Sequence, residues 1–358
     1  MIENSETYYG LSGLSRYRLR TMFVIAVFWT LIDLIVVLLG GFQPENLSVA
    51  ALFLRASIVF VLSFGMGHLF IFTLRKIFRK YPLWINFLSK SGILLAGALI
   101  ISFILNFTNN YFINGYTASE ALHHFVKESL HLKWLLQKTF YWLMLFLVTQ
   151  LYIEINEKYS PGVFIDILIG KYFKPKVEHR IIMFLDLKDS TPTAEKLGHV
   201  KYFLFIREFI YHISMAIIEN EGRIYQYVGD EIVVSWSATK NNFRNCLVSI
   251  IEARKNIQKK SQRFRRKYHT IPEFRVGLHV GDVTVGEVGV IKRDLAMSGD
   301  TMNTAARIRS ACNELNQKYI ASADFIAFGD LKDFQKESLG IVDLKGKAEG
   351  IELFALKI

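Results

Sequence analysis

The chain has 358 residues, of which 51% are hydrophobic, and its formal net charge is +11 at pH 7. A mean hydropathy of +0.25 excludes an entirely soluble protein of this length, because soluble domains carry a larger share of polar residues. With two cysteines, Cys246 and Cys312, no disulfide framework is expected.

Residues 1–154 hold most of the apolar sequence and predict an α-helical membrane domain. Four apolar stretches of roughly 20 residues are long enough to span a bilayer. They lie at about 21–40, 51–74, 84–107 and 134–154. Buried core helices are the alternative, but such runs exceed their usual length. The first stretch is also too long for a cleavable signal peptide, and no small-residue cleavage site follows it.

Loop charges predict how these spans are oriented. Basic residues precede the first span and fill the loop between the second and third spans, whereas the loop at about 41–50 has none. Because basic loops stay in the cytoplasm, we expect a multi-pass protein of the plasma or inner membrane. Its N-terminus and the chain after residue 155 would lie in the cytoplasm. Asp33 and Arg55 fall within the first two spans, where we expect a structural ion pair or, as the alternative, a role in sensing a signal.

The second half of the chain predicts a connector at 155–177 and a soluble domain at 178–358. We expect a short helix at 163–172 in the connector. In the domain, the pattern predicts a strand at 180–186, a helix at 199–220, a hairpin at 223–236, a helix at 241–268, a strand pair at 274–280 and 283–288, a helix at 301–315, and short strands near 318–321, 340–344 and 351–356. This order predicts an α+β, ferredoxin-like fold, in which helices back one face of an antiparallel-rich sheet.

Two carboxylates stand where neighbouring strands of the predicted sheet end. Asp186 closes the apolar run 181–186, and Asp230 lies in the Gly229-Asp230 turn of the predicted hairpin. Carboxylate oxygens suit Mg²⁺ and Mn²⁺, and two such ions can stabilise the attacking and leaving oxygens of a phosphoryl transfer. The pair therefore predicts phosphate chemistry.

A second group of polar residues follows further along the chain. Asn303 and Arg307 are four residues apart on a predicted helix, so both project from one face and suit a ribose and a charged phosphoryl group. Lys345, followed by Gly346, supplies a flexible cation that could reach a polyphosphate.

Basic residues are densest between Arg254 and Lys267. Such a run would suit nucleic acid. We favour a solvated helix face close to anionic lipid headgroups, and we expect no nucleic-acid partner.

Five segments of the second half resemble the class III nucleotide cyclases, that is, the adenylate and guanylate cyclases. These segments are Phe184–Thr191, Tyr227–Glu231, Arg275–Gly281, Ser298–Arg307 and Leu344–Lys347, and they occur in the order found in that family. The resemblance implies a membrane-anchored, bacterial-type cyclase domain at 178–358. It also implies an enzyme that converts ATP to 3′,5′-cyclic AMP and pyrophosphate for intracellular signalling.

The same resemblance implies a role for each candidate residue. Asp186, Asp230 and the carbonyl of Leu187 would bind two Mg²⁺ or Mn²⁺ ions, and Thr191 matches the family's turn after the first aspartate. Asn303 would orient the ribose, Arg307 would stabilise the transition state, and Lys345 would bind the terminal phosphates. Because the family takes these two sets from different chains, a homodimer with two shared sites is implied, and a monomer should be inactive.

Three residues depart from the family's pattern. Gln226 and Ala296 stand at the positions that select the base, where adenylate cyclases usually carry Lys and one of Asp, Thr or Ser. An amide pairs with either base edge and alanine offers no hydrogen bond, so GTP or a pyrimidine triphosphate stays an alternative to ATP. Asp189 replaces a frequent glycine in the phosphate-binding turn. A diguanylate cyclase and a weakly active signalling scaffold with this fold are further alternatives.

Overall fold

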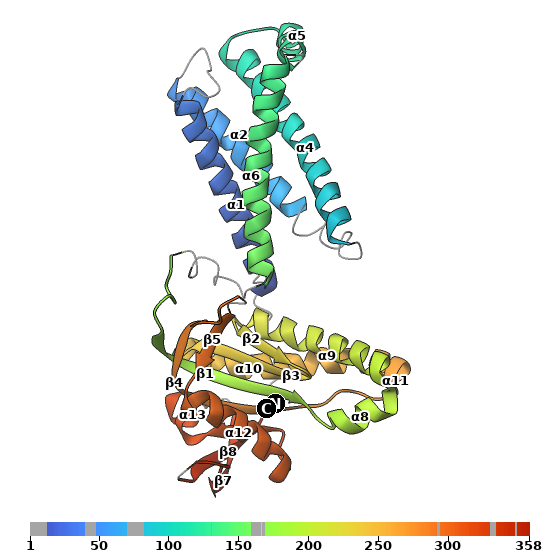
Figure 1. Ribbon diagram of the computed structural model, residues 1–358, viewed down its shortest axis with the longest axis vertical. Coiled ribbons are helices and arrows are strands. Elements are labelled where there is room, and N and C mark those ends of the chain that lie inside the picture. Colours follow the sequence, from blue (N-terminus) through green and yellow to red (C-terminus); the bar gives the residue numbers. More distant parts are fainter. Residues whose placement is uncertain are drawn as a thin grey trace. The chain divides into compact units, whose positions relative to one another are not determined.

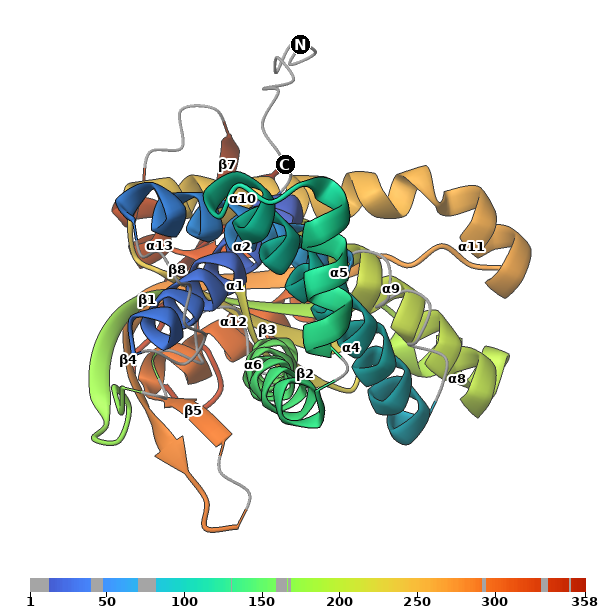
Figure 2. The same cartoon turned by 90° about the horizontal axis from the view of Figure 1, so that it is seen from above.

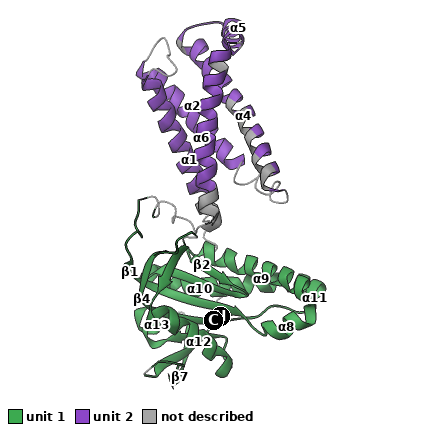
Figure 3. Cartoon of the chain, in the orientation of Figure 1, with its two compact units in different colours: residues 1–14, 159–358 green, residues 15–158 purple. Residues whose placement is uncertain are grey.

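The computed structural model describes residues 13–39, 48–69, 82–129, 131–158, 166, 169–291, 294–329, 334–347 and 349–358. The chain divides into two compact units, one within residues 15–158 and the other made mainly of residues 159–358 (Figure 3). The exact domain boundaries drawn from the sequence stay predictions.

The first unit is helical. Its elements are α1 (Gly13–Leu38), α2 (Val49–His68), α4 (Leu83–Thr108), the π-helix η2 (Asn109–Ile113), α5 (Ala118–Ser129) and α6 (Leu132–Lys158) (Figure 1). Within the described residues, Arg18–Leu38 and Val49–His68 are long and apolar enough to cross a membrane, judged by length and composition alone. Helices α4 and α6 cover the third and fourth predicted spans, and their place in a membrane stays a prediction.

A charged pair joins three of these helices. Asp33 of α1 is 1% exposed and accepts hydrogen bonds from Arg55 of α2, at 2.6 Å from Nε and 2.9 Å from Nη2. The hydroxyl of Tyr141 on α6 lies 3.5 Å from Asp33 Oδ1. The predicted ion pair is therefore present, and it is two-pronged, the stronger geometry for arginine and carboxylate.

The second unit is a mixed sheet with helices. Its elements are β1 (Lys176–Leu187), α8 (Ser190–Leu197), α9 (His199–Glu219), β2 (Arg223–Val228), β3 (Glu231–Ser237), α10 (Lys240–Lys259), α11 (Ser261–Tyr268), β4 (Phe274–Val288), β5 (Asp294–Ser298), α12 (Asp300–Glu314), β6 (Tyr319–Ser322), α13 (Ala323–Phe328), β7 (Gln335–Val342) and β8 (Ile351–Lys357). The strand order is β2-β3-β1-β4-β6-β8-β7, with β5 paired to β4. Only β4 and β6 run parallel among the pairings of the described strands. The first four strands thus confirm the predicted ferredoxin-like arrangement.

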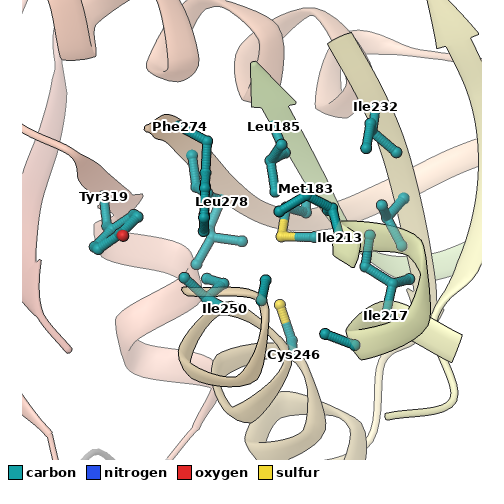
Figure 4. Packing of buried hydrophobic residues seen from close by; sticks show 14 of the residues in the cluster. Met183, Leu185, Ile213, Ile217, Ile232, Cys246, Ile250, Phe274, Leu278 and Tyr319 are labelled. Carbon is teal, nitrogen blue, oxygen red and sulfur yellow. The ribbon is translucent and has the colours of Figure 1, made fainter. Parts of the chain in front are cut away.

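Helices cover both faces of this sheet. On one face, Met183 and Leu185 of β1 pack with side chains of α9 and α10, such as Ile213 and Cys246 (Figure 4). On the other face, Ile182 and Phe184 of β1 pack with Met302 and Ala305 of α12. The prediction that helices back one face was therefore wrong. The apolar run in β1 is continuous rather than alternating, which is typical of a strand buried on both sides.

Two predicted elements differ from the structure. The helix predicted at 241–268 is two helices, because Lys260 leaves helical geometry at φ −105° and ψ 6° between α10 and α11. The strand pair predicted at 274–280 and 283–288 is the single strand β4. Gly281 lies within this strand and does not end it. Its lack of a side chain allows α12 to pack closely, since a Cβ at Gly281 would lie 2.6 Å from Thr301 Oγ1.

Other expectations concern the ends of the domain. Most of the helix predicted at 163–172 lies outside the described residues. The strands predicted near 318–321, 340–344 and 351–356 correspond to β6, β7 and β8, and β7 begins five residues earlier than expected. Strand β5 was not predicted. It pairs with the end of β4, and these paired ends extend away from the rest of the sheet (Figure 2).

Candidate active site

The sheet brings the two predicted aspartates to the same end of neighbouring strands. Asp186 is the penultimate residue of β1, and its neighbour Leu185 pairs with Ile232 of β3. Asp230 lies in the turn between β2 and β3, where Gly229 adopts φ +64°, a conformation that glycine reaches without steric cost. The antiparallel pairing of β1 with β3 places this turn beside Asp186.

The electrostatics of Asp186 reflect a crowded group of carboxylates. Burial raises the pKa of Asp186 to about 6, the guanidinium of Arg309 opposes that rise, and the nearby carboxylates of Asp230 and Glu231 add to it. Arg309 Nη1 donates to Asp186 Oδ2 at 3.2 Å, and Arg309 Nη2 lies 2.7 Å from Glu231 Oε2. Asp186 and Glu231 thus share one arginine, beside the third carboxylate of Asp230.

Asp230 differs from Asp186 and Glu231 because it forms no ion pair with Arg309 in the described structure. Its Oδ2 is buried and has no hydrogen-bond donor among the described residues. A buried carboxylate oxygen without a partner costs free energy unless a cation or a donor is supplied. This oxygen and those of Asp186 match the hard oxygen donors that Mg²⁺ and Mn²⁺ prefer, so the residues fit the implied metals. The described part of the chain contains no group of three or more His, Cys, Asp or Glu side chains arranged to hold a metal.

The turn after β1 carries the next predicted residues. Leu187 is the last residue of β1, and its side chain is buried in the core. Asp189 precedes α8 in the left-handed region, at φ 55° and ψ 41°, and its side chain makes no capping hydrogen bond. Thr191 is exposed in the first turn of α8. A left-handed residue here explains why a glycine would suit position 189.

The second predicted group gathers on a different side of α12. Arg307 lies against the loop that carries Lys345. A Cβ added to Gly346 in this loop would come within 3.2 Å of Arg307 Nη2. Gly346 adopts φ +77° in this turn. The loop is tied to the start of α12 by an ion pair between Lys347 and Asp300. Asn303 and Lys345 are exposed.

The positions expected to select the base lie on two strands. Gln226 is exposed on β2, after a bulge that leaves Tyr225 out of register. Ala296 is half-buried on β5 and pairs with Gly286. The backbone N–H of Met297 donates to the Tyr225 hydroxyl at 3.0 Å, which links the two segments. The methyl side chain of Ala296 has no donor or acceptor atom, so it cannot form a hydrogen bond with a base.

Polar contacts do not link the two predicted groups within the described part of the chain. Across the described residues, no hydrogen bond or ion pair joins Asp186 or Asp230 to Asn303, Arg307 or Lys345.

Sequence reasoning missed Arg309 and Lys347. Arg309 is four residues after Ala305 and three before Cys312, both of which are buried, so helical spacing places its charge on the sheet-facing side. An arginine at such a position signals an acidic partner. Lys347 lies two residues after Lys345, and the sequence offered no signal to distinguish their roles.

A family model and the curated relatives reported below all belong to the adenylate and guanylate cyclases. The model of the family described as "Adenylate and Guanylate cyclase catalytic domain" matches residues 174–357, slightly more than half of the chain. Adenylate cyclase 2 of Rhizobium meliloti (strain 1021) is 29% identical over 206 residues, which are 57% of this chain and 57% of that protein. Adenylate cyclase 1 of the same organism is 27% identical over 181 residues, which are 48% of this chain and 26% of that protein. The match therefore spans less than two thirds of either relative.

Solved structures that match part of this chain include two bacterial enzymes. The adenylyl cyclase CyaB from P. aeruginosa is 20% identical, with a TM-score of 0.47, covering 52% of this chain and 96% of that one. A bacterial light-regulated adenylyl cyclase is 20% identical, with a TM-score of 0.49, covering 60% of this chain and 62% of that one.

Proposed function

The chain belongs to the family of adenylate and guanylate cyclase catalytic domains, and on this premise we propose that it is a membrane-bound nucleotidyl cyclase. Its proposed reaction converts ATP to 3′,5′-cyclic AMP and pyrophosphate, in a homodimer with two shared sites. The membrane helices would anchor it as a multi-pass protein with a cytoplasmic catalytic unit.

One observation supports this proposal: the two groups of candidate residues lie on different elements and have different polar partners. Asp186 lies at the end of β1, where Arg309 contacts it, and Asp230 lies in the adjacent β2–β3 turn. Arg307 lies instead against the loop of Gly346. Because no hydrogen bond or ion pair joins the two groups among the described residues, we infer that a second copy related by two-fold symmetry would complete each site.

The chain's own residues suggest how the reaction proceeds. Asp186 and Asp230 would hold two divalent ions, which supply a lowered pKa for the ribose 3′-hydroxyl and compensate the triphosphate charge. Asn303 would orient the ribose so that its 3′-oxygen lies in line with the α-phosphorus.

The phosphates would meet the basic residues. The 3′-hydroxyl would lose its proton to water, and its oxygen would form the new bond to the α-phosphorus. The bond from that phosphorus to the bridging oxygen would break, and pyrophosphate would leave with that electron pair. Arg307 would stabilise the charge that develops on the α-phosphate oxygens, where its fixed donors act more strongly than water. Lys345 would hold the terminal phosphates and, afterwards, the pyrophosphate.

The direct test uses the full-length protein in detergent. It is incubated with Mn²⁺ or Mg²⁺ and, in separate reactions, with ATP, GTP, CTP and UTP, and the products are identified by mass spectrometry. We expect cyclic AMP, and we expect Asp186→Ala to abolish it while the protein stays folded and dimeric. A different cyclic nucleotide as the main product would contradict the assignment of ATP. No cyclic product from any triphosphate would contradict the proposal and favour a signalling scaffold.

A further inference from the structure

Arg309 forms ion pairs with two acidic residues in the metal-binding half of the proposed site, the half that contains Asp186 and Asp230. Its guanidinium bridges Asp186 Oδ2, at 3.2 Å from Nη1, and Glu231 Oε2, at 2.7 Å from Nη2. The three side chains are 23%, 22% and 16% exposed, so this bridge is largely removed from water. The contact to Asp186 is a hydrogen bond and the contact to Glu231 is an ion pair, so the two ends of the forked guanidinium hold two different acids in place.

The backbone places Arg309 there by a close approach of α12 to the sheet. A Cβ at Gly277 of β4 would lie only 2.3 Å from the backbone nitrogen of Arg309. Gly277 pairs with Phe184 of β1, two residues before Asp186. The backbone of the helix therefore rests directly on the strand next to the one that carries the aspartate, and this brings Arg309 within reach of Asp186.

The bridge leaves one carboxylate out. Arg309 contacts Asp186 and Glu231, whereas Asp230 Oδ2 is buried without a donor among the described residues. One positive charge thus faces three acids, and the unpaired oxygen lies at the place where a metal ligand is expected. A divalent ion that binds Asp186 must do so in the field of this guanidinium.

We propose that Arg309 is a positioning residue of the metal-binding half. It fixes the carboxylates of Asp186 and Glu231, and its positive charge repels the divalent ions that bind beside it. This inference rests on the proposed function, because it takes Asp186 as a metal ligand. Arg309 touches no reacting atom in this account, and it acts through the carboxylates.

Two substitutions distinguish the effect of the positive charge of Arg309 from the effect of its forked guanidinium. Arg309→Gln removes the positive charge, so Mn²⁺ should bind about tenfold more tightly, as expected for losing a unit charge near a divalent ion at a partly shielded site. Turnover at saturating Mn²⁺ should nevertheless fall, because the acids lose their fixed orientation. Arg309→Lys keeps the charge but not the fork, so its Mn²⁺ affinity should stay within about twofold of the unsubstituted protein while its turnover falls.

The experiment measures Mn²⁺ binding to the full-length protein in detergent, without nucleotide, from the electron paramagnetic resonance signal of free Mn²⁺. The matched control is Arg266→Gln on α11, an exposed arginine whose loss makes the same change in net charge. Asp186→Asn identifies the Mn²⁺ that belongs to this site. Turnover at saturating Mn²⁺ is measured on the same preparations.

Each outcome decides the inference. Tighter Mn²⁺ binding with lower turnover in Arg309→Gln, and neither change in Arg266→Gln, supports it. Binding that depends on Asp186 but is not tightened by Arg309→Gln overturns this inference alone. No Asp186-dependent binding in the unsubstituted protein overturns the metal site of the proposed function as well. Should Arg309→Gln fail to fold, the lysine variant decides: unchanged turnover there overturns the role of the fork.

Discussion

The contact between α12 and β4 provides the sharpest test of how the fold positions the site. Gly277 has no side chain, and a Cβ added there would lie 2.3 Å from Arg309 N, 2.7 Å from Ala305 O and 2.7 Å from Arg309 Cα. All three are backbone atoms of a helix, so no flexible side chain can move aside. Gly277→Ala must therefore displace α12 or distort the strand.

The size of the effect follows from these distances. Carbon contacts are normally about 3.5–4.0 Å, so α12 would have to withdraw by about 1 Å. Overpacking of this kind costs about 1–3 kcal/mol of unfolding free energy. The same shift moves Arg307 and Arg309 together, and a misplacement of about 1 Å can reduce turnover about 100-fold.

The assay is urea unfolding of the full-length protein in detergent, followed by circular dichroism, together with turnover under native conditions. Ser310→Ala is the control, because Ser310 is an exposed neighbour of Arg309 on α12 and its loss should change stability by less than about 0.5 kcal/mol. We expect Gly277→Ala to unfold at lower urea and to lose most activity. If Gly277→Ala matches the control in both measurements, the close packing of α12 on β4 is not what places the arginines.

Three other changes test separate parts of the structure. Asp189 adopts φ 55°, so Asp189→Gly should remove backbone strain and raise the melting temperature by an amount equivalent to about 1 kcal/mol; a lower melting temperature would contradict this. Burial lowers the pKa of His279, against the opposing carboxylate of Asp324, so the folded state binds this proton less well than the unfolded chain. The free energy of unfolding should therefore fall as the pH drops below about 6.5, and His279→Gln should flatten that fall in denaturation curves measured from pH 7.5 to 5. Asp33→Leu leaves Arg55 unpaired and should lower the free energy of unfolding by about 3–5 kcal/mol. The double variant Asp33→Leu with Arg55→Leu should recover most of this stability in thermal melts in detergent. An equal loss of stability in the single and double variants would contradict the pairing.

Much of the fold could be predicted from the sequence because the governing signals are local. The apolar run before Asp186 and the Gly229-Asp230 turn identify β1 and the β2–β3 hairpin, and the β-α-β-β-α-β succession predicts the ferredoxin-like arrangement of the first four strands. The strand break predicted near Gly281 was wrong because glycine serves close packing there as well as turns. Only the position of α12 in space distinguishes the two uses.

The candidate site shows the same division. Asp186, Asp230, Asn303 and Arg307 stand in recognisable segments, so the sequence alone selects them as candidates. Arg309 depends on a partner more than a hundred residues away in the chain, and its contact arises only when α12 packs against β4. Helical spacing indicates that its charge faces the sheet, but not which acid it meets.

The central claim is that two copies of the chain share each cyclase site, and mixing two inactive variants tests it most directly. Asp186→Ala removes a metal ligand and Arg307→Ala removes the transition-state arginine, so each homodimer should be inactive. When the two variants are expressed together, half of the randomly formed dimers pair one of each and contain one intact site, which predicts about a quarter of the unsubstituted activity. Cyclic AMP at about that level, with each variant alone silent, is the result expected. No recovery, in mixed dimers shown to form by differential tagging, would contradict a site built from two chains.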